Sequence, residues 1–205
     1  MPSSAVSNLS LLLGIQGESY DISCACTSSA QAVIVAARLI LSGEYDIVMT
    51  GGSEELSWYQ ALGFNAMRAL SHKYNDVPEQ ASRPFDKDRD GFVMAEGSGI
   101  MILESEEHAK ARGAKIYGYI SGFASNSNSS DMVVPDKNSS MSVMLKAVKN
   151  AGLKPEDISY VNTHGTSTPV GDCVEIEAIR SAFGSNPSLL VNSTKSQTGH
   201  MIGAA

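Results

Sequence analysis

The chain has 205 residues, of which 42% are hydrophobic and 18% charged, and it carries a net charge of −7. This composition is sufficient for a packed core and excludes a disordered polymer. No run approaches the roughly 18 apolar residues that cross a bilayer, and there is no basic cluster of the kind that binds nucleic acid. Three cysteines cannot form a disulfide framework and no export signal is visible, so we expect a reducing, cytoplasmic location.

The first half of the chain predicts helices that alternate with strands. Apolar residues recur at helical spacing from Val33 to Leu41, after the capping-competent residues 27–29 and before Gly43. A buried strand is expected at 45–50, closed by two glycines. The elements expected next are a polar loop (71–91), a strand (92–104) and a short charged helix (105–114).

The second half continues this alternation. It predicts a strand at 115–124, a polar loop, a helix at 141–151 and a strand at 158–162. A further helix is expected to be capped by Asp172 and stopped by Gly184, with a strand after it at 189–192. The alternation indicates an α/β protein, and the continuous apolar strand runs favour parallel, buried strands.

Four reactive side chains come just after predicted strands: Cys26, His164, Lys195 and His200. Sites in parallel α/β sheets form where strands end, so these four are candidates for one site. Cys26 stands before the first turn of a helix, where the positive helix end suits a nucleophilic thiol. Its position fits a buried structural cysteine equally well.

The two histidine loops are rich in small and hydroxyl-bearing residues. The loop after His164 contains Gly165, which allows a close backbone approach to a ligand, and the hydroxyls of Thr166 and Thr168. The later loop, NSTKSQTGH, contains the lysine and the second histidine. Histidine in such loops favours a functional role over a surface one.

No metal or cofactor is predicted. The C-A-C run at 24–26 lacks the spacing of structural zinc ligands, and phosphate-binding and dinucleotide fingerprints are absent. The run DKDRD (86–90) lacks the full calcium-loop pattern and is expected to be a loop whose arginine and aspartates pair. Cys24 and Cys173 are expected in the core, and His72 and His108 on the surface without a role.

Four segments resemble the β-ketoacyl-acyl-carrier-protein synthases, a family of condensing enzymes. They are ACTSSA around Cys26, RPFDKDRDGFV at 83–93, HGTSTPVGD at 164–172 and STKSQTGHMIGAA at 193–205. Their order and spacing are those of the family. The segments GGSEELSW and ALSHKYND are similar to the synthase I type of bacterial fatty-acid synthesis.

The resemblance implies a role for each candidate residue. Cys26 would carry the acyl chain as a thioester, while His164 and His200 would donate hydrogen bonds to the malonyl thioester oxygen. The remaining assignments are Lys195, which would hold His200, and Thr166 and Thr168, which would bind the phosphopantetheine arm.

The resemblance also implies a thiolase-like, layered αβαβα fold made of two halves. Residues 1–114 would form the later part of the first half, with the nucleophile, and residues 115–205 the earlier part of the second. The family unit is about twice as long. We therefore expect missing N-terminal strands and a missing Gly-Phe-Gly-Gly loop, whose amide completes the oxyanion hole, and little activity from these residues alone.

The implied reaction is the decarboxylative Claisen condensation that elongates fatty acyl chains. A polyketide ketosynthase domain is an alternative, and so is a non-catalytic carrier-docking fragment, although Cys26 argues against the latter. The implied partner is an acidic acyl carrier protein, for which Arg68 and Lys73 are candidate contacts. The family also implies a homodimer.

Overall fold

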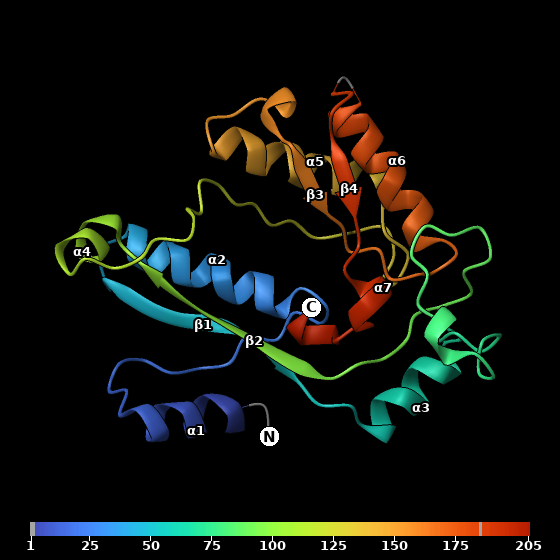
Figure 1. The fold of residues 1–205 in the computed structure, drawn as a ribbon, viewed down its shortest axis with the longest axis horizontal. Coiled ribbons are helices and arrows are strands. Elements are labelled where there is room, and N and C mark those ends of the chain that lie inside the picture. Colours follow the sequence, from blue (N-terminus) through green and yellow to red (C-terminus); the bar gives the residue numbers. More distant parts are fainter. Residues whose placement is uncertain (1–2, 185) are drawn as a thin grey trace. The chain divides into compact units, whose positions relative to one another are not determined.

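The computed structural model describes residues 3–184 and 186–205, and the chain divides into two compact units (Figure 1). The first unit combines the chain up to Glu55 with Glu96–Tyr117 and Met201–Ala205. The second combines Leu56–Ala95 with Gly118–His200. Each unit is thus assembled from segments that are far apart in the sequence.

The first unit is built on a two-stranded antiparallel sheet. Strands β1 (Ile47–Glu54) and β2 (Gly97–Glu104) pair along their full length. Helix α2 (Ser28–Leu41) packs along them, as Figure 1 shows. The other elements of this unit are α1 (Ser4–Leu13), α4 (Glu106–Ala111) and the 3₁₀ turn η3 (Ile202–Ala204).

Two glycines allow close packing around β1. A Cβ atom on Gly51 would lie 2.0 Å from the carbonyl oxygen of Gly99, and one on Gly52 would lie 2.8 Å from the Cβ of Ser29. These separations exclude any side chain. The prediction that Gly51 and Gly52 close the strand is therefore wrong, because β1 runs through both so that β2 and α2 can approach its backbone.

The second unit contains a short parallel sheet packed against two helices. Strand β3 (Tyr160–Asn162) pairs with β4 (Leu190–Asn192), and α5 (Lys137–Asn150) packs on α6 (Gly171–Phe183). The buried cluster of this unit consists of Val148, Ile179, Ala182 and Phe183. Its remaining elements are α3 (Trp58–Ala66), α7 (Lys195–Thr198), η1 (Pro78–Gln80) and η2 (Pro155–Asp157).

Some local predictions are confirmed. Helix α2 occupies the predicted range, and Gly43 after it has φ 74°, the left-handed conformation that favours glycine. Helix α6 ends at Gly184 as expected. Helix α5 begins four residues before the predicted start because Asp136 caps it, its carboxylate accepting the Ser139 N–H at 2.7 Å.

Other predictions are wrong. The segment 115–124 forms no strand in the described part of the chain, and β2 begins at Gly97 rather than at residue 92. Parallel pairing holds for β3 and β4 but not for β1 and β2. The strands are also not fully buried, since Ile100 and Ile102 are each 48% exposed.

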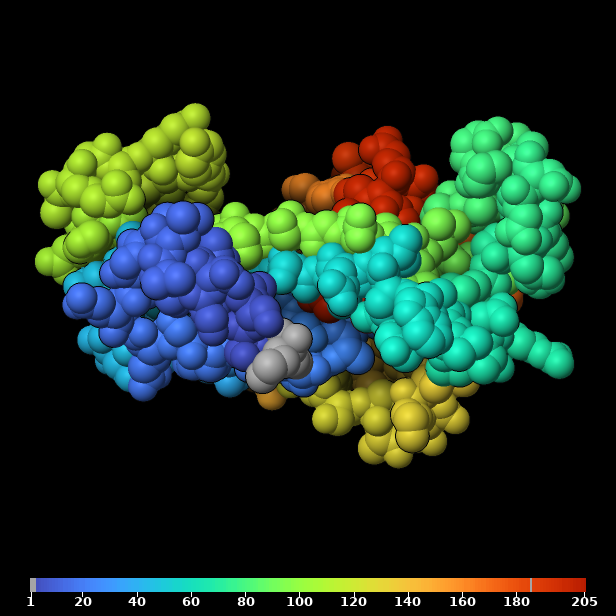
Figure 2. Space-filling model, turned by 90° about the horizontal axis from the view of Figure 1, so that it is seen from below, coloured from blue at the N-terminus to red at the C-terminus, as the bar shows by residue number. Residues whose placement is uncertain are grey.

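Helix α3 was not predicted, and it exposes large apolar side chains. Trp58 and Tyr59 stack with ring centroids 3.7 Å apart, yet both are largely exposed, as is Leu62. Figure 2 shows this helix, in teal, on the molecular surface. Among the described residues no helix is both long and apolar enough to cross a membrane.

Candidate active site

Cys26 lies in the first unit, on a tight turn that leads into α2. Thr27 is the N-cap of this helix, so Cys26 lies immediately before the helix N-terminus. The Cys26 residue is partly exposed. Partial exposure at a helix N-terminus is the environment in which a nucleophilic cysteine can be approached by substrate, and it does not fit a deeply buried structural cysteine.

His164 lies in the second unit, two residues beyond β3. Its backbone N–H and that of Gly165 donate to the two carboxylate oxygens of Glu175, each at 2.7 Å. Glu175 is on α6, and burial raises the pKa of its carboxyl group. Sequence reasoning missed this residue. Its position three residues after Asp172, on the same helix face, is the signal that could have found it.

His200 and Lys195 follow β4 in the same unit. The His200 backbone N–H donates to the Val93 carbonyl at 2.8 Å, and the Ala95 N–H donates to the His200 carbonyl at 3.0 Å. The His200 ring packs edge-on against Phe92, with centroids 5.3 Å apart. His200 and Lys195 are buried, at 3% and 8% exposure.

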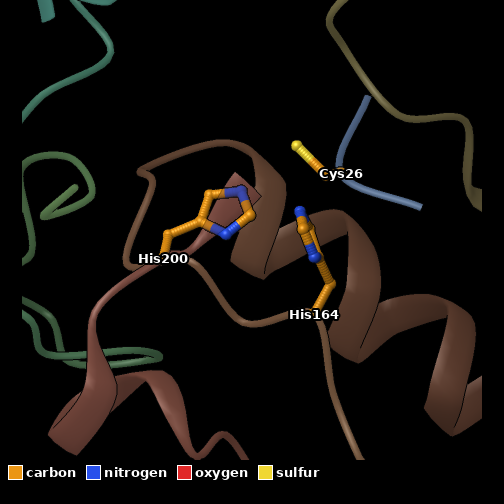
Figure 3. Close-up of side chains that lie close together, drawn as sticks. All are labelled: Cys26, His164 and His200. Carbon is orange, nitrogen blue, oxygen red and sulfur yellow. The ribbon is translucent and has the colours of Figure 1, made fainter. Parts of the chain in front are cut away.

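The two imidazoles lie next to each other. Their ring centroids are 5.1 Å apart and their planes nearly perpendicular, at 86° (Figure 3). This pairing agrees with the expectation that parallel strands deliver side chains to one sheet edge, because β3 and β4 end beside each other.

Both histidines are neutral at physiological pH. Desolvation, with the charge of Lys195, lowers the pKa of His164 to about 4, although this residue also has a solvent-exposed part. Desolvation, with His164 and Lys195, lowers the pKa of His200 to about 3. A neutral imidazole donates one N–H, so the pair offers two donors that can stabilise negative charge developing on an oxygen.

These low pKa values predict a loss of stability in acid. The unfolded chain takes up protons at a histidine pKa near 6.5, whereas folded His200 resists protonation until about 3. The free energy of unfolding should therefore fall as the pH drops below 6.5, by at most about 1.4 kcal/mol per pH unit for this group. Urea melts at about pH 7 and pH 5 measure it: His200→Gln should lose less stability than wild type. An equal loss would contradict the prediction.

A buried carboxylate joins the His164 loop to the 83–92 segment. Asp172 is 1% exposed and accepts the Phe85 N–H at 2.8 Å and the Thr168 N–H at 3.2 Å. The Arg89 Nε lies 3.6 Å from this carboxylate and donates to the Thr168 carbonyl at 2.9 Å. Asp172 therefore connects two loops rather than serving as the N-cap of α6, which is Val170.

Removing this carboxylate should be strongly destabilising. Asp172→Ala leaves two backbone N–H groups without their acceptor and the Arg89 guanidinium without its ion-pair partner, and breaking such a buried pair costs about 3–5 kcal/mol. Chemical denaturation measures the change. Asp88→Ala is the matched control, since Asp88 is exposed in the same segment and should change stability by about 0.5 kcal/mol or less. Equal effects of the two variants would refute the assignment.

The other predicted residues have mixed outcomes. Thr166 is buried, and its hydroxyl lies 3.2 Å from that of Thr168 in the loop after His164. Cys24 and Cys173 are exposed, so their predicted place in the core is wrong. Cys173 instead contacts Arg89, whose Nη2 lies 2.9 Å from its Sγ.

The charged run 86–90 also differs from expectation. Its arginine pairs with Asp172 outside the run, and Asp86 pairs with Arg83 at 3.1 Å. Asp90 is buried and accepts the Ser71 hydroxyl at 2.6 Å. Asp86 thus pairs locally, whereas Asp90 finds its partner at long range because the segment folds back on a neighbouring loop.

His72 and His108 show the surface character expected of them. The His72 side chain is 75% exposed, and its Nδ1 lies 3.4 Å from Asp90. His108 pairs with Glu104 at the end of β2, on the first unit. Neither contact involves His164 or His200.

Two family models match the chain. The model described as the N-terminal domain of beta-ketoacyl synthase matches residues 1–109, and that of the C-terminal domain matches residues 117–205. Together they cover nearly the whole sequence, in the order in which the two domains are named.

Curated relatives agree with these models. The chain is 47% identical over 203 residues to 3-oxoacyl-[acyl-carrier-protein] synthase 2 of Vibrio cholerae, an alignment that covers 97% of this chain and 49% of the relative. It is 48% identical over 191 residues to 3-oxoacyl-[acyl-carrier-protein] synthase 1 of Escherichia coli, an alignment that covers 93% of this chain and 46% of the relative. The chain thus spans about half the length of the curated relatives it matches.

Solved structures share the fold. A beta-ketoacyl synthase from Burkholderia phymatum matches with a TM-score of 0.95 and 40% identity, over 100% of this chain and 50% of that one. A ketosynthase in complex with a type II polyketide acyl-carrier protein matches with a TM-score of 0.94 and 38% identity, over 98% of this chain and 50% of that one. The predicted α/β, thiolase-like fold is confirmed, and the chain belongs to the beta-ketoacyl synthase family.

Proposed function

We propose that these 205 residues are part of a 3-oxoacyl-[acyl-carrier-protein] synthase, which joins an acyl thioester to malonyl-acyl-carrier-protein with loss of carbon dioxide. The observation that carries the proposal is the pair of neutral imidazoles beside buried Lys195. The names of the relatives, all 3-oxoacyl-carrier-protein synthases, support it.

In this proposal Cys26 supplies the nucleophile, and the two histidines act on the malonyl substrate. Its thiolate attacks the acyl thioester, and the carrier's thiol leaves, so the acyl chain is held on Cys26. His164 and His200 then donate to the malonyl thioester oxygen as decarboxylation places negative charge on it. The enolate carbon attacks the acyl group on Cys26 and releases the longer chain.

The remaining site residues position these groups. Burial, assisted by the positive charge of Lys195, lowers the pKa of both imidazoles and keeps them neutral, and a neutral ring can donate without protonating the enolate. Thr166 and Thr168 offer hydroxyls to the phosphopantetheine arm beside His164. The proposed organisation is the later part of the first family half in residues 1–114 and the earlier part of the second in residues 115–205.

The test uses the natural polypeptide that contains these residues. With malonyl-carrier labelled in its free carboxyl group, we expect release of labelled carbon dioxide together with formation of a 3-oxoacyl-carrier product. The 205 residues alone should show little of either activity, and activity near that of the natural polypeptide would contradict the fragment interpretation. Absence of carbon dioxide release from the natural polypeptide would refute the function.

Two alternatives have distinct outcomes. The likeness to a polyketide ketosynthase favours a chain-building role outside fatty-acid synthesis, which would give products that keep their 3-oxo groups through several cycles. A non-catalytic docking function would leave Cys26 unmodified by iodoacetamide or cerulenin in the folded protein. Mass spectrometry of the labelled peptide tests the docking alternative, and analysis of the products tests the polyketide alternative.

The carrier should approach a basic surface. Arg68 and Lys73 are both exposed in the second unit, as such a contact requires. Reversing both charges (Arg68→Glu with Lys73→Glu) should weaken carrier binding by about tenfold at low salt and less at high salt. Fluorescence anisotropy with labelled carrier measures this, and Lys87→Glu, an exposed lysine elsewhere in this unit, is the control. Unchanged affinity would remove both residues from the interface.

A homodimer and a cytoplasmic location complete the proposal. The odd number of cysteines, three, supports a reducing compartment. Light scattering of the natural polypeptide at micromolar concentration tests the dimer.

A further inference from the structure

We propose that Cys24 and Cys26 form a reversible disulfide when a hydroperoxide oxidises Cys26, with Cys24 as the resolving thiol. Only Ala25 separates the two cysteines, and both are reduced in the structure. In the structure Cys24 is exposed and Cys26 is partly exposed. Oxidation-sensing cysteines are typically accessible and placed next to such a second thiol.

The backbone turns sharply between the two cysteines. The Thr27 N–H donates to the Cys24 carbonyl at 3.1 Å, which closes a four-residue turn, and Ala25 has φ 49°. The ends of such a turn lie within about 7 Å of each other. Two trans peptides span at most about 7.2 Å when extended, and the turn at Ala25 shortens that span, so the Cα atoms of Cys24 and Cys26 are expected within the roughly 4.4–6.8 Å that a disulfide spans.

Side chains at the start of α2 hold this turn in place. The Ser28 hydroxyl accepts the Cys24 N–H at 2.9 Å and donates to the Ala25 carbonyl at 2.7 Å. The Thr27 hydroxyl donates to the Cys24 carbonyl at 2.8 Å. Because these bonds already fix the backbone, bringing the two thiols together costs little further conformational entropy.

The chemistry needs one hydroperoxide and proceeds in two steps. The Cys26 thiolate attacks the peroxide, a sulfur–oxygen bond forms as the oxygen–oxygen bond breaks, and hydroxide or alkoxide leaves. The Cys24 sulfur then attacks the Cys26 sulfenic acid, a sulfur–sulfur bond forms, and the oxygen leaves as water with the Cys24 proton. A dithiol reductant converts the Cys24–Cys26 disulfide back to two thiols.

The disulfide would protect the sulfur of Cys26 from further oxidation. A sulfenic acid without a neighbouring thiol proceeds to sulfinic acid, which is irreversible in most proteins. The disulfide itself depends only on the turn. The disulfide should also stop the condensation, and reduction should restore it. Both expectations rest on the proposed function of Cys26 as nucleophile.

The experiment treats the natural polypeptide with hydrogen peroxide, blocks remaining thiols with N-ethylmaleimide and digests it with trypsin. The peptide that ends at Arg38 carries Cys24 and Cys26, whereas Cys173 lies on another peptide. We expect this peptide to lose the mass of two hydrogens and to take up no maleimide, and dithiothreitol to restore both thiols. Cys24→Ser should instead gain two or three oxygens on Cys26, as sulfinic or sulfonic acid, and stay oxidised after dithiothreitol.

Cys173→Ser is the matched control and should behave as wild type, since Cys173 lies on α6. Direct conversion of wild type to sulfinic acid, or equal recovery of wild type and Cys24→Ser, would overturn the proposal. If the disulfide forms but the reduced protein releases no carbon dioxide from malonyl-carrier, the proposed function fails while the redox inference stands.

Discussion

Cys26→Ser is expected to reduce acyl transfer by about 10³-fold or more while leaving the fold intact. A serine hydroxyl is nearly the same size as a thiol but is a much weaker nucleophile at neutral pH. The N-terminal end of α2, directly after Cys26, can assist a thiolate, whereas a hydroxyl would need a base to remove its proton. Intact-protein mass spectrometry after mixing with acyl-carrier measures the covalent acyl-enzyme directly.

Two controls make this result specific. Cys24→Ser and Cys173→Ser should both retain the acyl adduct and near wild-type turnover under reducing conditions, because neither thiol is assigned to the reaction. The prediction is wrong if Cys26→Ser still accumulates acyl-enzyme within tenfold of the wild-type rate. An adduct on Cys24 or Cys173 would transfer the nucleophilic role to that residue.

His200→Ala should slow decarboxylation by about 10²–10³-fold, the usual effect of removing one donor from an oxyanion site. Acylation of Cys26 should persist, because the proposed role of His200 begins with the malonyl substrate. A burst of acyl-enzyme followed by slow release of carbon dioxide is the expected signature. The two half-reactions are measured separately, by mass spectrometry and by labelled carbon dioxide.

His72→Ala is the control for this variant. Its side chain is 75% exposed and should contribute nothing to either half-reaction. Equal loss of acylation and decarboxylation in His200→Ala would indicate a structural role for His200, which packs against Phe92. Circular dichroism and a urea melt of the same variant would then show a matching loss of stability.

The sequence alone was a good guide to elements whose causes are local. The helix before Gly43 and the stop at Gly184 depend on spacing and on one glycine each, and the structure has both. His164 and His200 were also expected together, because strands that run parallel end at one edge. The sequence carried this information in strand order and in loop composition.

The features that were missed depend on contacts between distant segments. The antiparallel pairing of β1 with β2 joins residues about fifty positions apart, and apolar runs alone do not indicate direction. Asp172 was assigned to a cap position and Glu175 was missed, yet both carboxylates accept hydrogen bonds from loop backbone, at Phe85 and at His164. Cys173 is likewise exposed because it lies on the outer face of α6, and the residues next to it in the sequence do not indicate which face that is.

The shortness of β3 and β4 has a consequence for natural variation in length. Each strand has three residues, with Asn162 opposite Asn192, and His164 follows only two residues after β3. An inserted residue there would rotate the imidazole to the other side of the chain. Variants of the protein should therefore tolerate insertions in the polar loop at 125–134 but not between Asn162 and His164. Deep mutational scanning with single-codon insertions can test this.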